Sequence, residues 1–342
     1  MIHDQVGLSS VKSISKIEDV KHMSDFSVTV IIPCHNAQQW LPATLASVAA
    51  QTLIPQQVIL IADRCTDDSV QLARDYDLPI LVLESDFGNA ASARNMGIEH
   101  AEHPWIALLD ADDQWYPQHL ENAAKMLVQT DQVAYCGRYD LMDNVDGRHP
   151  MVGFDVPEFS KSKTHLTHTD YLDLMLKHIP FGHQTVIYQR ERLSKVGGFN
   201  PSFVRRHDID LWLRMIYNHT WAFQSQTSAS YRDQTPGAIS RNRVEVAYYE
   251  MLAMVNNQKQ YQSPQLEHLI KGYARQAMSA ALLLADKTWA AKLRALAWPY
   301  LDIKYKSIYA TLGICPPLLR SLVRLKRKVT TRHIDVVMKE VP

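Results

Sequence analysis

Short hydrophobic runs recur through the first third of the chain, each bounded by polar residues or proline. They span residues 28–32, 58–61, 80–83 and 106–109, and they are rich in β-branched residues or leucine. Runs of this length and composition predict buried β-strands.

Segments with helical spacing of hydrophobic residues lie between these runs, at residues 40–48, 70–73 and 90–98. Strands that alternate with helices predict parallel βαβ units and a Rossmann-like α/β sheet covered by helices on both faces. Ligands of such sheets bind beyond the carboxyl ends of the strands. The polar residues that closely follow these runs are Asn36, Asp63, Asp110 and Asp112.

The second half of the chain divides into two parts. Residues 185–188 and 221–223 are predicted strands, and residues 208–218 a predicted helix. Beyond Pro236 the chain is rich in Ala, Leu, Met and Gln, which favour helices. The helices expected there span residues 244–257, 265–285 and 289–300.

These patterns predict three regions. Residues 1–25 form a polar extension, residues 26–236 an α/β domain, and residues 237–342 a helical region. Within the α/β domain, residues 26–130 form one half and residues 131–236 the other.

The amino-acid composition is consistent with these predicted regions. The chain has 342 residues, of which 46% are hydrophobic and 21% charged, as is ordinary for globular proteins. Its 36 basic and 36 acidic residues balance, so nothing indicates a nucleic-acid partner. The chain contains no run of about 18 apolar residues, so no membrane span is predicted. The cysteines are widely spaced without a CxxC pair, which favours a reducing cytoplasm over a disulfide framework or a thiolate zinc site.

The C-terminal segment differs in charge from the rest of the chain. From Pro316 onward there are seven Lys or Arg and two acidic residues, and Leu318, Leu319, Leu322 and Val323 recur at helical spacing. One interpretation is an amphipathic helix over residues 316–332 that contacts an anionic membrane peripherally, on the cytoplasmic face of the inner membrane. The other is a helix docked on its own domain with a solvated basic face.

Three carboxylates, those of Asp110, Asp112 and Asp113, follow the run at residues 106–109. Their mutual repulsion is relieved if a divalent cation binds, since Mg²⁺ and Mn²⁺ characteristically bridge one or two carboxylates to substrate phosphates. The alternative is an acidic turn or an N-cap cluster for a helix that starts near Tyr116.

A second acidic cluster begins the predicted helix at residues 208–218. Asp208 lies at its N-terminus, where backbone N–H groups and the helix dipole favour the ionised carboxylate. An ionised carboxylate can accept a proton, so Asp208 is a candidate general base. An ordinary capping aspartate is the alternative.

Together these motifs resemble family 2 glycosyltransferases of the GT-A fold. The resemblance rests on five segments that occur in order, at residues 28–36, 45–51, 62–69, 93–97 and 109–113. Residues 197–199 and 208–214 resemble the acceptor half of the same family. The resemblance implies an α/β fold with a mostly parallel mixed sheet, followed here by a C-terminal helical region.

The resemblance also implies roles for the donor-side residues. Pro33 and Asn36 resemble the first nucleotide-binding loop, and Asp63 the aspartate that hydrogen-bonds the donor's base, usually uracil. Arg94 resembles the basic residue near the base and diphosphate. Asp110 resembles the residue that faces the ribose and metal-bound water.

On the metal and acceptor sides, Asp112 resembles the direct ligand of Mn²⁺ or Mg²⁺, with Asp110 beside it, and Asp208 resembles the catalytic base. The expected acceptor-side residues are His207, Asp210 and Trp212. Three positions depart from the family pattern. Ala62 replaces an acid, His207 replaces the acid that often precedes the base, and residues 231–234 lack a metal-binding His after Tyr231-Arg232.

The sequence thus predicts an inverting glycosyltransferase that moves a sugar from a nucleotide-diphosphate donor, a UDP-sugar by resemblance, to a saccharide or lipid-linked acceptor in cell-surface polysaccharide or glycolipid synthesis. The alternative is a catalytically silent scaffold or sugar-nucleotide sensor. A sugar-phosphate nucleotidyltransferase is disfavoured because no Gly-rich loop with a basic residue follows the first strand. A zinc site at His165 and His168 is disfavoured because no third ligand is adjacent.

Overall fold

The structure is a computed structural model that describes residues 26–128, 130–142, 164–177, 181–232, 243–283 and 287–314. These residues divide into two compact units. The first contains the described residues up to Val204 together with 214–232, and the second contains Arg205–Leu213 and the described residues from 243 onward. The predicted extension 1–25, the basic segment 316–332 and the boundary at 236–237 lie outside the described residues.

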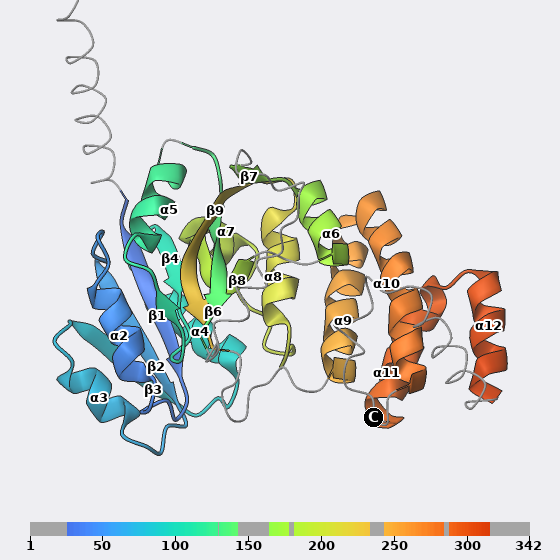
Figure 1. The fold of residues 1–342 in the computed structure, drawn as a ribbon, viewed down its shortest axis with the longest axis horizontal. Helices are drawn as coiled ribbons and strands as arrows, with labels where there is room; N and C mark the ends of the chain where they lie inside the picture. The colour runs from blue at the N-terminus through green and yellow to red at the C-terminus, as the bar shows by residue number, and fades with distance from the viewer. Residues whose placement is uncertain are drawn as a thin grey trace, which may run out of the picture. The chain divides into compact units, whose positions relative to one another are not determined.

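Nine strands form one mixed sheet among the described residues, in the order β3-β2-β1-β4-β8-β6-β9-β5 with β7 paired to β9 (Figure 1). The strands are β1 (Val28–Cys34), β2 (Gln57–Asp63), β3 (Ile80–Ser85), β4 (Trp105–Leu108), β5 (Gln114–Trp115), β6 (Ala134–Leu141), β7 (His165–Leu166), β8 (Phe181–Gln189) and β9 (Trp221–Tyr231). The helices of the first unit are α2 (Leu41–Ala49), α3 (Ser69–Asp75), α4 (Ala90–His100), α5 (His119–Leu127), α6 (His168–Lys177) and α7 (Arg190–Lys195).

Strands β1 to β4 are parallel, as the alternating pattern predicts. Successive residues of β1 face opposite sides of the sheet. Val30 and Ile32 belong to a core that includes buried residues of α2, α3 and α5. Ile31 faces α4, where Gly97 allows close packing because a Cβ there would lie 2.4 Å from the Ile31 Cγ2 atom. Helices therefore cover both faces of the parallel strands, and the predicted Rossmann-like α/β sheet is confirmed.

The sheet becomes mixed beyond β4. β8 is antiparallel to both β4 and β6, whereas β6 and β9 are parallel. The predicted strands at residues 185–188 and 221–223 lie within β8 and β9. Strand β6 was not predicted, since its Tyr-Cys-Gly-Arg-Tyr sequence lacks the clear hydrophobic run of β1.

The second unit is helical. Its elements are the start of α8 (His207–Ile216), then α9 (Arg243–Tyr261), α10 (Pro264–Leu283), α11 (Lys287–Ala297), the 3-10 turn η2 (Trp298–Tyr300) and α12 (Ile303–Ile314). The helix predicted over residues 289–300 ends at Ala297, because Pro299 lacks a backbone donor and disfavours the α conformation before it. No helix in the described part of the chain is long and apolar enough to cross a membrane.

Candidate active site

The carboxyl ends of β1 and β4 mark a topological switch point. β1 lies between β2 and β4 and pairs in parallel with both. The chain leaves β1 toward β2 and β3 on one side and returns to β4 on the other. Ligands of open α/β sheets bind beyond the strand ends at such a point. The residues that follow these strands therefore form the candidate donor site.

Pro33 and Asn36 lie where the sequence predicts them, at the end of β1. Pro33 is opposite Ile61 in the β1–β2 register, and Asn36 has a left-handed backbone conformation with φ of 49°. The Asn36 Oδ1 atom accepts hydrogen bonds from the Thr66 backbone N–H at 2.7 Å and from its hydroxyl at 3.2 Å. The loops after β1 and β2 are thereby tied together.

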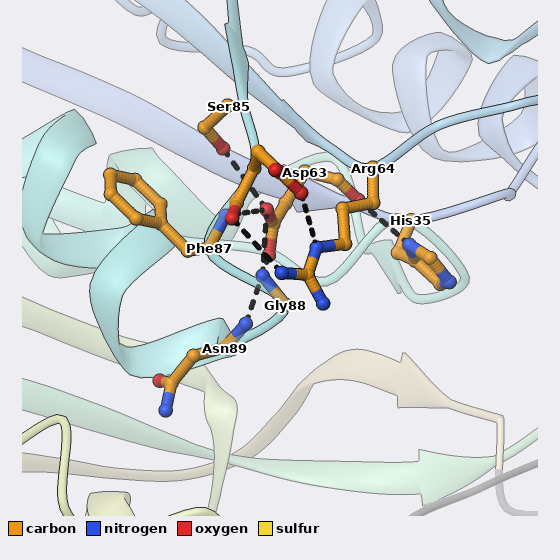
Figure 2. Close-up of polar contacts among 8 residues, drawn as sticks. His35, Asp63, Arg64, Ser85, Phe87, Gly88 and Asn89 are labelled. Atoms are coloured by element: carbon orange, nitrogen blue, oxygen red, sulfur yellow. Dashed lines mark hydrogen bonds and ion pairs between the residues drawn. The ribbon is translucent and has the colours of Figure 1, made fainter.

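Asp63 organises the loop between β3 and α4 (Figure 2). Its Oδ1 atom accepts hydrogen bonds from the Ser85 hydroxyl at 3.2 Å and from the N–H groups of Phe87 and Gly88 at 2.7 and 3.0 Å. Its Oδ2 atom accepts one from the Asn89 N–H at 3.0 Å. An ionised carboxylate has about four acceptor positions. The Oδ2 atom accepts one of the four bonds and Oδ1 the other three, and a contact of Asp63 with a donor base stays a prediction.

Neighbouring contacts fix the same loop. The His35 Nδ1 atom lies 2.7 Å from the Asp63 carbonyl oxygen, and Arg64 pairs with Asp86 at 2.5 Å (Figure 2). The Asn89 side chain caps α4 by accepting hydrogen bonds from the N–H groups of Ala91 and Ser92, the second and third residues of the helix. Asp63 therefore sits at the centre of a network that positions the start of α4.

We expect Asp63→Ala to destabilise the fold by about 1–3 kcal/mol, because three backbone N–H groups of the β3–α4 loop lose their acceptor. Urea unfolding of wild type and variant measures the difference. Asp77→Ala, which removes an exposed aspartate from the same half of the domain, is the matched control. Equal stability of the two variants would contradict the organising role of Asp63.

Arg94 and Asp110 form an ion pair that joins α4 to the segment after β4. The Arg94 Nη2 and Asp110 Oδ1 atoms are 2.5 Å apart, and their side chains are 5% and 32% exposed. The guanidinium carbon also lies 5.8 Å from the centre of the Phe199 ring. A positive charge thus adjoins the carboxylate cluster at the switch point, as expected if this edge binds a diphosphate.

Asn95, which the sequence analysis left without a role, connects two motifs far apart in the chain. Its side-chain oxygen accepts a hydrogen bond from the Phe199 N–H, and its amide donates one to the Phe199 carbonyl, both at 2.8 Å. Gly198 has φ of +64°, and a Cβ there would lie 2.7 Å from the Asn95 oxygen. Only glycine allows this approach without strain.

The three carboxylates after β4 have different surroundings. Asp110 and Asp112 are half-buried, whereas Asp113 is fully buried. The Asp113 Oδ1 atom accepts a hydrogen bond from the Arg232 N–H at 2.9 Å. Burial, followed by the charges of Asp110 and Asp112, raises the pKa of Asp113 well above its usual range. Asp113 therefore connects this turn to the end of β9. The candidate metal ligands are then the other two carboxylates, Asp110 and Asp112.

Two carboxylates suit Mg²⁺ or Mn²⁺, which commonly take one or two such ligands together with substrate phosphates and water. Among the residues that the structure describes, no three His, Cys, Asp or Glu side chains form a metal-binding group. Asp233 and Gln234, which stand where the resemblance predicts a metal-binding His after Tyr231-Arg232, lie outside the described residues. Asp110 and Asp112 are thus candidate metal ligands, and that role stays a prediction.

The predicted acceptor-side residues belong to α8 and are assigned to the second unit. Asp208 and His207 are half-buried at the start of the helix, and the Asp208 Oδ1 atom accepts a hydrogen bond from the Ile209 N–H at 2.9 Å. Asp210 and Trp212 are 3% and 2% exposed. Asp210 accepts a hydrogen bond from Asn257 of α9 at 3.2 Å. Burial favours a structural role for these last two residues.

The family profile described as "Glycosyl transferase family 2" matches residues 29–197, which contain β1 to β4 and the carboxylate turn. The chain belongs to glycosyltransferase family 2. This assignment confirms the resemblance drawn from the ordered motifs, and it makes the protein a glycosyltransferase.

Curated relatives of this family 2 glycosyltransferase include two bacterial glycosyltransferases. The Escherichia coli protein named "UDP-Glc:alpha-D-GlcNAc-diphosphoundecaprenol beta-1,3-glucosyltransferase WfgD" is 28% identical over 57% of this chain and 71% of its own length. The Bacillus subtilis protein named "Putative teichuronic acid biosynthesis glycosyltransferase TuaG" is 27% identical over 64% of this chain and 84% of its own length.

Solved structures of S. aureus TarS resemble the fold of this glycosyltransferase. TarS superposes with a TM-score of 0.60 at 16% identity, over 86% of this chain and 52% of TarS. TarS 1-349 in complex with UDP superposes with a TM-score of 0.53 at 18% identity, over 77% of this chain and 73% of that one. At this identity the likeness concerns the fold alone.

Proposed function

We propose that this protein is an inverting, metal-dependent glycosyltransferase that transfers a sugar from a UDP-sugar to an acceptor hydroxyl. The observation that carries the proposal is the pair of half-buried carboxylates, Asp110 and Asp112, beside Arg94 at the switch point of the sheet. This arrangement suits a nucleoside diphosphate, because the arginine and a divalent cation both offset the charge of the phosphates.

In the proposed donor site, Pro33 and Asn36 belong to the first nucleotide-binding loop. Asp63 contacts the base, and Arg94 lies near the base and diphosphate. Asp112 would hold the metal directly, and Asp110 would lie beside it and face the ribose. When bound, Mn²⁺ or Mg²⁺ stabilises the negative charge that develops on the leaving diphosphate. The Arg94–Asp110 pair keeps the Asp110 carboxylate oriented before the donor arrives.

In the proposed reaction, Asp208 accepts the proton of the acceptor hydroxyl. The acceptor oxygen then forms a bond to the anomeric carbon as the bond between that carbon and the diphosphate oxygen breaks. Attack from the face opposite the leaving group inverts the configuration, and the nucleoside diphosphate departs. The position of Asp208 at a helix N-terminus supports this role, since the helix dipole favours its ionised form.

The proposed acceptor is a saccharide or a lipid-linked saccharide of cell-surface polysaccharide or glycolipid synthesis. WfgD, whose printed name states a diphosphoundecaprenol-linked acceptor, supports this class. Such an acceptor would be met at the cytoplasmic face of the inner membrane. The proposed membrane-contacting segment 316–332 lies outside the described residues and stays a prediction.

A binding screen tests the proposal. Calorimetry with UDP, GDP and dTDP sugars, with and without Mn²⁺ or Mg²⁺, is expected to detect binding of a UDP-sugar that depends on the metal. Mass spectrometry of reactions with candidate acceptors then detects transfer. Binding without hydrolysis or transfer to any acceptor would favour the alternative, a sugar-nucleotide sensor or silent scaffold, and absence of any donor binding would contradict the proposed donor site.

A further inference from the structure

Two cysteines lie together at the end of β1. Cys34 is the last residue of this strand and is buried, whereas Cys65, in the loop after β2, is half-buried. Their sulfur atoms are 4.0 Å apart, and the Cys65 thiol donates a hydrogen bond to the Cys34 carbonyl oxygen at 3.4 Å. Both are free thiols, although 31 positions separate them in sequence.

The two sulfur atoms are close enough to bond after a small movement. A disulfide has a sulfur–sulfur distance of about 2.05 Å, so the atoms would have to approach by about 2 Å. Cys34 is held in the sheet opposite Ala62, whereas Cys65 lies outside the strands and helices and follows Arg64, whose φ is 55°. The movement would therefore fall mainly on the loop that contains Cys65.

The surroundings make Cys65 the more reactive thiol. A hydrogen bond from the Cys34 thiol, assisted by the Asn36 backbone, lowers the pKa of Cys65 to about 7 against the opposing effect of burial. The hydrogen bond with Cys65, together with burial, raises the pKa of Cys34. Because the thiolate is the nucleophile, Cys65 would react first and Cys34 would resolve the intermediate.

We propose that Cys34 and Cys65 form a reversible disulfide that controls the loops at the donor site. In the first step the Cys65 thiolate attacks a low-molecular-weight disulfide such as oxidised glutathione, which breaks its S–S bond and releases one glutathione thiolate. In the second step Cys34, deprotonated, attacks the Cys65 sulfur and expels the second glutathione thiolate. The two protons lost by the cysteines are recovered on the two glutathione molecules.

The pair is coupled to the donor site through adjacent residues. Asn36 lies two residues after Cys34, and Thr66 directly follows Cys65. The Asn36 side-chain oxygen accepts hydrogen bonds from the N–H and the hydroxyl of Thr66. A disulfide that draws Cys65 toward Cys34 displaces Thr66 from Asn36. This effect on donor binding rests on the proposed function, whereas formation of the disulfide does not. Reversible redox-sensing disulfides of this kind occur in the cytosol.

Peptide mapping tests the disulfide directly. Trypsin cleaves after Lys21, Arg64 and Arg74, so Cys34 and Cys65 fall in separate peptides, residues 22–64 and 65–74. The full chain is incubated with oxidised glutathione, alkylated and digested without reductant. The two peptides are expected to appear linked and to separate after dithiothreitol. Cys136, whose pKa is raised by its complete burial, is the internal control and is expected to stay a free thiol.

A binding measurement tests the consequence. UDP with Mn²⁺ is expected to bind the oxidised protein several-fold more weakly than the reduced protein, and dithiothreitol is expected to restore the affinity. Cys65→Ser is expected to bind UDP alike before and after glutathione treatment.

Two results would overturn the proposal. Unlinked Cys34 and Cys65 peptides from folded, glutathione-treated protein exclude the disulfide, and unchanged UDP affinity in a linked sample excludes its control of the donor site. A reduced protein that binds no UDP would instead contradict the proposed donor site, while the peptide map would still decide whether the disulfide forms.

Discussion

Asp208→Asn is expected to lower the rate of sugar transfer by about 100- to 10,000-fold, the usual contribution of a general base. The amide keeps the size and the hydrogen-bonding oxygen of the carboxylate but accepts no proton at neutral pH. Donor binding is expected to be unchanged, because the substitution leaves Arg94, Asp110 and Asp112 in place. A radiolabelled donor with a competent acceptor measures turnover, and calorimetry measures donor affinity.

The matched control is Asp302→Asn, which removes an exposed carboxylate from the same unit. It is expected to retain wild-type turnover. A turnover of Asp208→Asn close to that of the control would remove Asp208 from the role of base. A parallel loss of donor affinity and stability would instead indicate that Asp208 serves as a structural helix cap.

Asp112→Ala is expected to weaken metal-dependent donor binding by at least about 10- to 100-fold, since even residues that only support metal ligands contribute this much to metal affinity. The expected loss appears in the presence of Mn²⁺ or Mg²⁺ and is much smaller without metal. Titrating UDP into wild type and variant, each with and without metal, separates the metal-dependent contribution from the rest.

Asp131→Ala provides the charge-matched control, because Asp131 is exposed and lies just before β6. Both β4 and β6 are antiparallel to β8, so β4 and β6 run in the same direction. Asp131 therefore lies at the opposite edge of the sheet from the carboxylate turn. Equal donor affinity of Asp112→Ala and Asp131→Ala in metal would show that Asp112 is not a ligand. Thermal unfolding of both variants excludes a general loss of structure.

The sequence was sufficient for β1 to β4 and the helices between them, because strand and helix formation there follow local patterns. Buried parallel strands need continuous hydrophobic runs, and β1, β2 and β4 have them. Strand β6 lacks such a run because the half-buried Arg138, Tyr139 and Asp140 interrupt it, and its pairing with β8 and β9 comes from tertiary contacts. Pattern alone therefore could not find it.

The ordered motifs likewise predicted which residues form the candidate site. The positions of Pro33, Asn36, Asp110 and Asp112 at strand ends follow from the βαβ order, since parallel strands bring their carboxyl ends to one edge. Their chemical roles stay predictions. Residue type and spacing do not reveal the hydrogen bonds that each side chain makes.

Those hydrogen bonds depend on the tertiary structure, which brings residues distant in sequence into contact. Asp63 binds the β3–α4 loop, Asp113 binds the backbone of Arg232, and Asn95 binds Phe199, each across a separation that sequence patterns do not record. The sulfur atoms of Cys34 and Cys65 lie 4.0 Å apart for the same reason, since Cys34 ends β1, Cys65 follows β2, and these two strands are neighbours in the sheet. Local patterns determine strands and helices, whereas contacts between distant side chains depend on how those elements pack.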